Sequence, residues 1–362
     1  MINQNNQLQK VEAFMSESTK KRKAVVHLLV ACILVCQFFF VSNVMAAAKR
    51  TTTKPPHNRI QKGNAFMGNS TNEKTKLRFI FITSFADIPF LVPVKKGMND
   101  AAAQLGVSCD FTGPSGMDSV AQAKMIRQAV ADGYDGIVLN ILEAPPMAEA
   151  IAEVHKAGIP LVAFNVDDQS VETGRLSAIC QNLYKAGQTL GKRAASSIAD
   201  GSRVFIVMHD EGIEALEERR KGIEDGLKGK DITFEILIGG DNENAARVVT
   251  EQLKANPDVK AVLCTGQSDT EGTGFAIERN FNRQDYYVAG FDLSYETLRM
   301  IKDGTISFAI DQQPYAQGYY PVVQLTHYLR YGIAPSDMDA GNNIIDQDKA
   351  GLVIELSKNN YR

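Results

Sequence analysis

The sequence predicts an α/β protein with two similar lobes, each a doubly wound parallel sheet covered by helices. Short apolar runs of strand length alternate with helix-like segments from about Leu77 onward. This alternation occurs twice, over residues 77–165 and again over residues 203–302. Alternating β and α signals of this kind favour parallel sheets with helices on their faces. The runs at 135–140 and 258–264 are loosely alike, which supports an internal repeat of the lobe.

The first set of elements begins at Leu77. Its expected strands are Leu77–Thr83, Val107–Phe111, Gly136–Asn140 and Leu161–Asn165. Its expected helices are about Leu91–Leu105, Asp118–Ala131 and Pro145–Ala157. Asp118 can cap the second helix, and Pro145 suits a first turn whose N–H groups have no partner within the helix. Gly106, Gly133 and Gly158 follow the three helices, where a left-handed residue is needed.

The second set repeats this order. Its expected strands are Arg203–His209, Thr233–Ile238, Val259–Thr265 and Tyr286–Phe291. Its expected helices are Glu214–Lys228, Asn244–Ala255, Thr270–Glu278 and Ser294–Lys302. A further apolar strand ends at Ile310-Asp-Gln-Gln313. Parallel sheets bind ligands outside the carboxyl ends of their strands, so the polar residues at those ends are the candidates for function.

The first 48 residues indicate export. A basic cluster at residues 20–23 precedes an apolar run over 24–41, and small residues follow at 44–48. This order is typical of a cleaved signal peptide, here with an N-terminal extension before the basic cluster. Two alternatives stay open: a retained membrane anchor, and lipidation at Cys32 within Leu29-Val-Ala-Cys32. Residues 49–76 are basic and rich in Thr and Asn, and they predict a disordered tether.

Charge and cysteine content exclude several classes of function. The whole chain carries a net charge of −3, and cleavage after residue 48 would make it −6, so no general attraction to nucleic acid or anionic lipid is expected. Cys109, Cys180 and Cys264 are widely spaced and are expected as buried structural thiols. No metal site is expected, because no pair of cysteines or histidines has ligand spacing. No cofactor is expected either, since phosphate-binding glycine motifs are absent from the sequence.

Two strand ends near the C-terminus suggest a sugar site. The run Val288-Ala-Gly-Phe-Asp292 ends in a carboxylate, and Ile310-Asp-Gln312 ends in an amide. A carboxylate accepts hydrogen bonds from hydroxyl groups, while Gln both donates and accepts them, so Asp292 and Gln312 can hold a polyol without reacting with it. We expect both side chains to be solvated in an open cleft. The alternative is that they are ordinary polar residues in loops.

These motifs resemble the type 1 periplasmic binding proteins, specifically the ribose- and galactose-binding group, from about Leu77 to the end of the chain. The resemblance implies two lobes joined by three crossings near residues 181–182, 311–313 and 341–342. It places the N-terminal lobe at residues 77–181 and 313–341, and the C-terminal lobe at 182–312 and 342–362. By the same resemblance, the lobes close over a sugar.

The resemblance also implies ligand-binding roles for further residues. Phe90 matches the family's sugar-stacking position, although the second Phe of the family is Leu91 here. Asn140 and Asn165 match polar strand ends, but Val166 stands where the family has Arg, so ribose specificity is not carried over. Three more candidates match less directly, namely Asp167, Arg219 and Asp269. Arg220 stays an alternative to Arg219, and Gln267 or Ser268 is expected beside the ligand.

The predicted function is a monomeric periplasmic receptor that captures a monosaccharide or cyclitol and delivers it to an inner-membrane ABC permease. A sensory subunit for a chemoreceptor or sensor kinase is the alternative on the same fold. A sugar-responsive DNA-binding regulator would need a helix-turn-helix where the export signal lies. An enzyme is not favoured, because the sequence offers no recognisable set of nucleophile and base.

Overall fold

The computed structural model describes residues 76–362 of the chain. The predicted signal peptide at residues 1–48 and the predicted tether at 49–76, apart from its last residue, lie outside the described residues.

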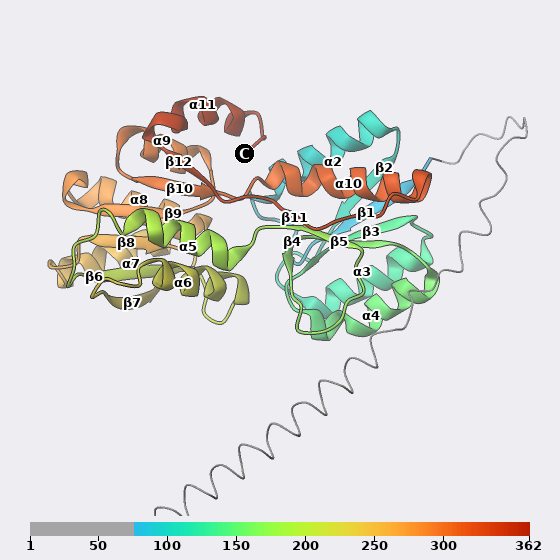
Figure 1. The fold of residues 1–362 in the computed structure, drawn as a ribbon, viewed down its shortest axis with the longest axis horizontal. Coiled ribbons are helices and arrows are strands. Elements are labelled where there is room, and N and C mark those ends of the chain that lie inside the picture. Colours follow the sequence, from blue (N-terminus) through green and yellow to red (C-terminus); the bar gives the residue numbers. More distant parts are fainter. Residues whose placement is uncertain (1–75) are drawn as a thin grey trace, which may run out of the picture. The chain divides into compact units, whose positions relative to one another are not determined.

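The described chain forms two six-stranded sheets of matching topology (Figure 1). The first sheet contains β1 (Arg78–Ile82), β2 (Ser108–Thr112), β3 (Gly136–Ile141), β4 (Leu161–Asp167), β5 (Ser177–Cys180) and β11 (Met338–Asp339). The second contains β6 (Arg203–Met208), β7 (Thr233–Ile238), β8 (Ala261–Cys264), β9 (Tyr287–Phe291), β10 (Phe308–Asp311) and β12 (Asn343–Asp346). Their orders are β11-β5-β4-β3-β1-β2 and β12-β10-β9-β8-β6-β7. β12 pairs antiparallel with β10, and the other strand pairs are parallel. The predicted fold class is confirmed.

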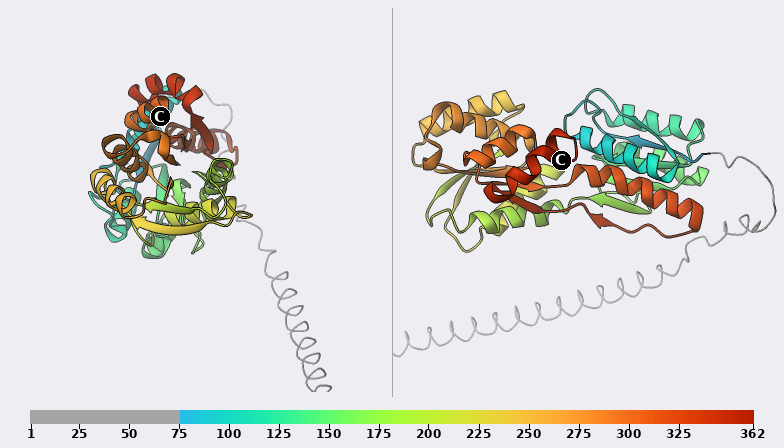
Figure 2. Two further views of the ribbon diagram at one scale, coloured as in Figure 1. Left: turned by 90° about the vertical axis from the view of Figure 1, so that its left-hand side faces the viewer. Right: turned by 90° about the horizontal axis from the view of Figure 1, so that it is seen from above.

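Helices cover both faces of each sheet. Those of the first lobe are α2 (Leu91–Leu105), α3 (Ser119–Ala131), α4 (Ala144–Ala157) and α10 (Pro314–Tyr331). Those of the second are α5 (Leu183–Ala194), α6 (Glu214–Gly226), α7 (Asn242–Ala255), α8 (Gln267–Asn280), α9 (Tyr295–Asp303) and α11 (Gln347–Lys358). Helices α2 and α10 run side by side on one face, and α3 and α4 pack together on the other (Figures 1 and 2). Among residues 76–362, no helix combines the length and apolar character needed to span a membrane.

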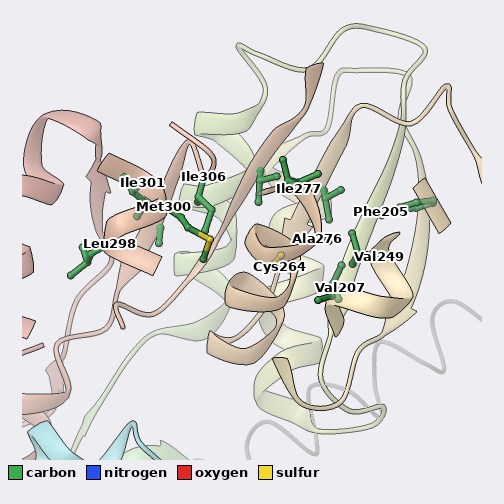
Figure 3. Packing of buried hydrophobic residues seen from close by; sticks show 14 of the residues in the cluster. Phe205, Val207, Val249, Cys264, Ala276, Ile277, Leu298, Met300, Ile301 and Ile306 are labelled. Atoms are coloured by element: carbon green, nitrogen blue, oxygen red, sulfur yellow. The ribbon is translucent and has the colours of Figure 1, made fainter. Parts of the chain in front are cut away.

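Alternation along the strands explains why both faces of the sheets are covered. In β6, Phe205 and Val207 pack with Val249 of α7 and Ile277 of α8 on one face (Figure 3). The intervening residue Ile206 packs against α5 and α6 on the opposite face. Successive side chains of a strand point to opposite faces, so an uninterrupted apolar strand requires helices on both sides.

The helix ends agree with the sequence signals. The Asp118 carboxylate accepts a hydrogen bond from the backbone N–H of Ala121 at 2.8 Å, as expected of a capping residue. Gly106 and Gly158 end their helices in the left-handed conformation, with φ of 62° and 71°. Pro145 lies in the first turn of α4. These predictions are confirmed.

The cysteines in this region are free thiols. Cys264 is fully buried, as predicted, whereas Cys109 and Cys180 are only partly buried. Burial raises the pKa of the Cys109 thiol to about 12.

The chain passes from one lobe to the other in three connecting segments. They lie between β5 and α5, between β10 and α10, and between β11 and β12. The sequence analysis did not identify α5, α10, α11 or the short strands β5, β11 and β12.

Helices α5 and α6 approach each other through glycines. A Cβ atom on Gly187 would lie 2.2 Å from the carbonyl oxygen of Arg219, and one on Gly222 would lie 2.2 Å from the carbonyl oxygen of Tyr184. Only glycine allows this approach. Because α5 begins just after the first connecting segment, the contact brings Arg219 of α6 close to Gln181 in that segment.

Candidate functional site

A cavity of about 550 Å³ lies at the carboxyl ends of strands from both sheets. Its volume lies within the range of small-molecule sites. Six of the eight predicted binding residues line this cavity: Phe90, Asn140, Asn165, Arg219, Asp292 and Gln312. The fold therefore brings together residues that are far apart in the sequence.

A bulge positions the two asparagines of the first lobe. The register between β3 and β4 shifts between Leu139 and Ile141. Asn165 lies within this irregularity and has a left-handed φ of 65°. The Asn140 Nδ2 group donates to Asn165 Oδ1 at 2.8 Å. Bulges change the direction of side chains, and Asn tolerates the left-handed conformation better than most residues.

Asp292 occupies the corresponding place in the second lobe. It directly follows β9, which has the same position in the order of the second sheet as β4 has in the first. Its φ of 70° is also left-handed. The Gln312 Nε2 group donates to Asp292 Oδ1 at 2.5 Å. Two non-glycine residues in this rare conformation face one cavity, which is typical of functional sites.

The expectation that Asp292 and Gln312 are solvated is wrong. Their exposed fractions are 7% and 6%. Burial raises the pKa of the Asp292 carboxyl above its ordinary value, while the nearby Arg219 and the hydrogen bond from Gln312 act against this rise. The carboxylate is therefore held at the cavity wall by specific partners.

Arg219 is the most extensively bonded of the predicted residues. Its guanidinium donates to Gln181 Oε1 from Nε at 3.2 Å and from Nη2 at 2.7 Å, and Nη1 donates to the carbonyl oxygen of Thr265 at 2.8 Å. The group lies over the ring of Phe291, 4.2 Å from its centroid, and 3.9 Å from Asp292 Oδ2. With only 5% of Arg219 exposed, its charge is buried and oriented.

The structure distinguishes Arg219 from Arg220. The Arg220 guanidinium forms ion pairs with Glu217 and Glu224 on its own helix, at 2.8 Å and 2.5 Å. It does not line the cavity. Of the two arginines left open by the sequence, Arg219 is the one at the cavity.

Hydrogen bonds connect the cavity with the segments between the sheets. Asn165 Nδ2 donates to Gln317 Oε1 at 3.1 Å, and Gln317 Nε2 donates to the carbonyl oxygen of Gln312 at 2.8 Å. Gln181, which binds Arg219, donates from Nε2 to the carbonyl oxygen of Gly341 at 2.8 Å. The sequence analysis placed Gln181 at a crossing between the lobes, but it assigned neither Gln181 nor Gln317 a role at the ligand site. The available signal for both was a glutamine within or next to a predicted crossing.

Two aromatic rings line the cavity. Phe90 lies at the start of α2, and Phe85 lies in the loop after β1. Leu91, the family's second aromatic position, is 1% exposed and packs in the core with Val94. Phe85 was missed because the prediction considered only the position next to Phe90.

Asp167 and Asp269 do not line the cavity, contrary to the prediction. β4 continues beyond the bulge to Asp167, whose Oδ2 atom pairs with Nη2 of Arg175 at 2.6 Å. Asp269 is fully buried because α8 begins two residues before it, which directs the side chain inward. There Asp269 Oδ2 accepts from Thr265 Oγ1 at 3.3 Å.

His209 lies between Asp269 and the cavity. Its Nδ1 atom is 3.8 Å from Asp269 Oδ2, which is beyond hydrogen-bond distance but close enough for electrostatic attraction. Burial lowers the pKa of His209, yet the neighbouring Asp269 carboxylate outweighs this effect, so the net shift is upward. His209 lines the cavity, and it was noted in the sequence only as a strand-end residue.

Gln267, Ser268 and Glu271 complete the wall formed by α8. Either Gln267 or Ser268 was expected beside the ligand. Glu271, one helical turn after Gln267, was missed because the sequence predicted a helix that begins at Thr270, whereas α8 begins at Gln267.

The cavity suits a ligand that is rich in hydroxyl groups. Its carboxylates and amide oxygens accept hydrogen bonds from hydroxyls, and the amide and guanidinium N–H groups donate to sugar oxygens. The aromatic rings can pack against the C–H face of a sugar ring.

Comparison with known proteins places the fold in a family. Residues 79–333 match the model of the periplasmic binding protein domain. The chain is 27% identical to the xylose/arabinose-binding protein XylF of Sulfolobus acidocaldarius over 295 residues, which is 77% of this chain and 73% of that protein. It is also 27% identical to the D-allose-binding periplasmic protein of Escherichia coli over 259 residues, 68% of this chain and 82% of that protein.

A solved structure of a sugar-transport protein has a similar fold. The carbohydrate transporter from Acidothermus cellulolyticus, in complex with myo-inositol, superposes with a TM-score of 0.69 and 29% identity. The match covers 79% of this chain and all of that one.

Proposed function

Because the chain belongs to the periplasmic binding protein domain family, we propose that it captures a sugar or related polyol in the cavity and delivers it to an ABC transporter permease. The single observation that carries this proposal is the buried group of Arg219, Asp292 and Gln312 at the wall of the cavity. These side chains are held in place by hydrogen bonds, and they present acceptors and donors without an evident reactive nucleophile.

Five of the lining residues have proposed roles. Asp292 and Asn140 accept hydrogen bonds from ligand hydroxyls, and Arg219 donates to ring or hydroxyl oxygens. Phe90 and Phe85 pack against the apolar face of the ligand. The relatives support this proposal, since their names describe binding of xylose or arabinose and of allose.

We propose that the three connecting segments act as the hinge and that the lobe bounds lie at residues 181/182, 312/313 and 341/342. The hydrogen bonds from Gln317 to Gln312 and from Gln181 to Gly341 support this role. The first bond joins Gln312 at the cavity to α10, and the second joins two of the segments that would move on closure.

A ligand of the right class is expected to raise the midpoint of thermal unfolding. A ligand that binds only the folded state adds about 2.7 kcal/mol at a hundredfold excess over Kd. This corresponds to a shift of a few degrees for a domain of this size. The measurement is a thermal-shift screen of residues 49–362 against pentoses, hexoses, amino sugars and cyclitols. A library in which no member shifts the midpoint would contradict the proposed function.

We further propose that the protein is exported and that cleavage occurs after Ala46 or Ala48, as the basic, apolar and small-residue order of positions 20–48 indicates. N-terminal sequencing of the protein recovered from cells is expected to begin at residue 47 or 49. Retention of residues 24–41 would show a membrane anchor, and a lipid-modified Cys32 at the N-terminus would show a lipoprotein.

A further inference from the structure

Glu271 is a buried carboxylate at the cavity that has no cationic partner among residues 76–362. It is 9% exposed and lines the cavity from α8. Its Oε1 accepts from Gln267 Nε2 at 3.3 Å, and its Oε2 accepts from Asn242 Nδ2 at 3.2 Å. Both partners are neutral amides. Burying a carboxylate without a counter-charge is unfavourable, even where its hydrogen bonds are made.

The basic side chains at the cavity already face other carboxylates. Arg219 lies 3.9 Å from Asp292, and His209, which is positive only when protonated, lies 3.8 Å from Asp269. Within residues 76–362, Glu271 takes part in no such ion pair. The N-terminus of α8 also carries a partial positive charge, but Asp269 lies in its first turn, closer to the helix end than Glu271.

A second buried acceptor lies in the first lobe. Asn140 is 3% exposed and lines the cavity, and within residues 76–362 its Oδ1 atom has no hydrogen-bond partner. Buried polar atoms are rarely left without a partner, and a donor on the ligand would supply one once this oxygen turns toward the cavity. The first lobe and the second lobe thus both present acceptors to the ligand.

A second cavity that adjoins the first is lined by acidic side chains. This second cavity, of about 900 Å³, shares the lining residues Ser84, Met117, Leu142 and Ile213. No Lys, Arg or His lines it, whereas six carboxylates do: Asp118, Glu143, Asp168, Asp210, Glu211 and Glu214. Such a lining attracts cations and repels anions.

We propose that the ligand is a polyol with a positively charged amino group, an amino sugar or an aminocyclitol, and that its ammonium group binds beside Glu271. The inference rests on the proposed function and specifies its ligand class. An ammonium group supplies three donors and the missing positive charge, whereas a neutral hydroxyl supplies only hydrogen bonds. A carboxylated sugar would add a further negative charge to the site.

Calorimetric titration of matched pairs tests the ligand class. The pairs are glucosamine with glucose, galactosamine with galactose, and an amino-inositol with myo-inositol, and glucuronate serves as the anionic member. For at least one pair, the amino member is expected to bind about tenfold or more tightly than its neutral parent, as for a charge-assisted hydrogen bond. Glucuronate is expected to bind more weakly than glucose.

The variant Glu271→Gln tests the residue. It keeps the size of the side chain, removes the charge and replaces one of the two acceptor oxygens by an NH2 donor, so it is expected to abolish the preference for the amino member. The quantity compared is the ratio of the affinities for the amino member and its neutral parent, in the variant and in the parent protein. The matched control is Glu251→Gln on the exposed face of α7, where the carboxylate pairs with Arg247, and this change is expected to keep the preference.

The outcomes separate this inference from the proposed function. If neutral polyols bind and no amino member binds more tightly, the inference is overturned while the proposed function stands. If the preference is present but unchanged in Glu271→Gln, the assignment of the ammonium group to Glu271 is overturned. If no member of the panel binds and the wider thermal-shift library is also negative, both proposals fall.

Discussion

Arg219→Leu is expected to lower the free energy of unfolding by about 3–5 kcal/mol and to abolish ligand binding, because it removes one partner of a buried pair. The change leaves Asp292 buried without its nearest cation. It also leaves Gln181 Oε1 and the carbonyl oxygen of Thr265 without the donors that they have in the structure. Leucine fills part of the space above the Phe291 ring but replaces none of these hydrogen bonds.

Chemical denaturation of the unliganded variant, followed by calorimetric titration of the folded fraction, measures both effects. Arg220→Leu is the matched control, because it removes the neighbouring guanidinium from a partly exposed pair with Glu217 and Glu224. Exposed ion pairs contribute about 0–1 kcal/mol, so the control is expected to stay close to the parent protein. Equal effects of the two substitutions would contradict the role given to Arg219.

Most of the fold could be predicted because apolar segments of strand length alternate with helix-like segments along the chain. Strands such as β6 are apolar without interruption and bounded by turns, and both features are visible in the sequence. The missed elements lack this signal. β11 has two residues, and β5 and β12 have four each. These three strands lie at or next to a sheet edge, and their pairing depends on the strands beside them rather than on an apolar pattern of their own.

Helix α10 was missed for a different reason. Pro321 lies inside α10, and proline in a helix interior normally argues against a helix. Gly318 of the same helix is required by packing, since a Cβ atom there would lie 1.9 Å from the carbonyl oxygen of Val94 in α2. Tertiary contact with α2 therefore outweighs the weak local propensity of α10.

The sequence predicts the site residues that lie at strand ends. It does not predict those whose position depends on a bulge or on where a helix begins. Asn140, Asp292 and Gln312 come at or just after strand ends, and parallel strands bring those ends together. Asp167 was misplaced because the bulge at Asn165 changes the direction of the residues after it. Glu271 was missed because its place at the cavity depends on where α8 begins.

Asp292→Asn is expected to weaken ligand binding about ten- to a hundredfold, which corresponds to about 1–3 kcal/mol for the loss of a charged acceptor. The asparagine keeps an oxygen that accepts from Gln312, so the local conformation is expected to persist. Its left-handed backbone also suits asparagine. The change therefore removes the charge at the cavity with little change of shape.

The unfolding midpoint of Asp292→Asn is expected to stay within a few degrees of the parent, because two effects oppose each other. Burial disfavours the ionised carboxyl, as its raised pKa shows, so removal of the charge is favourable. Loss of attraction to Arg219 at 3.9 Å is unfavourable. Calorimetric titration measures the ligand affinity, and thermal unfolding measures the midpoint. Asp231→Asn, on the exposed surface of the same lobe, is the control. Unchanged affinity in Asp292→Asn would show that this carboxylate serves the fold rather than the ligand, and the site would have to be reassigned to the other residues of the cavity.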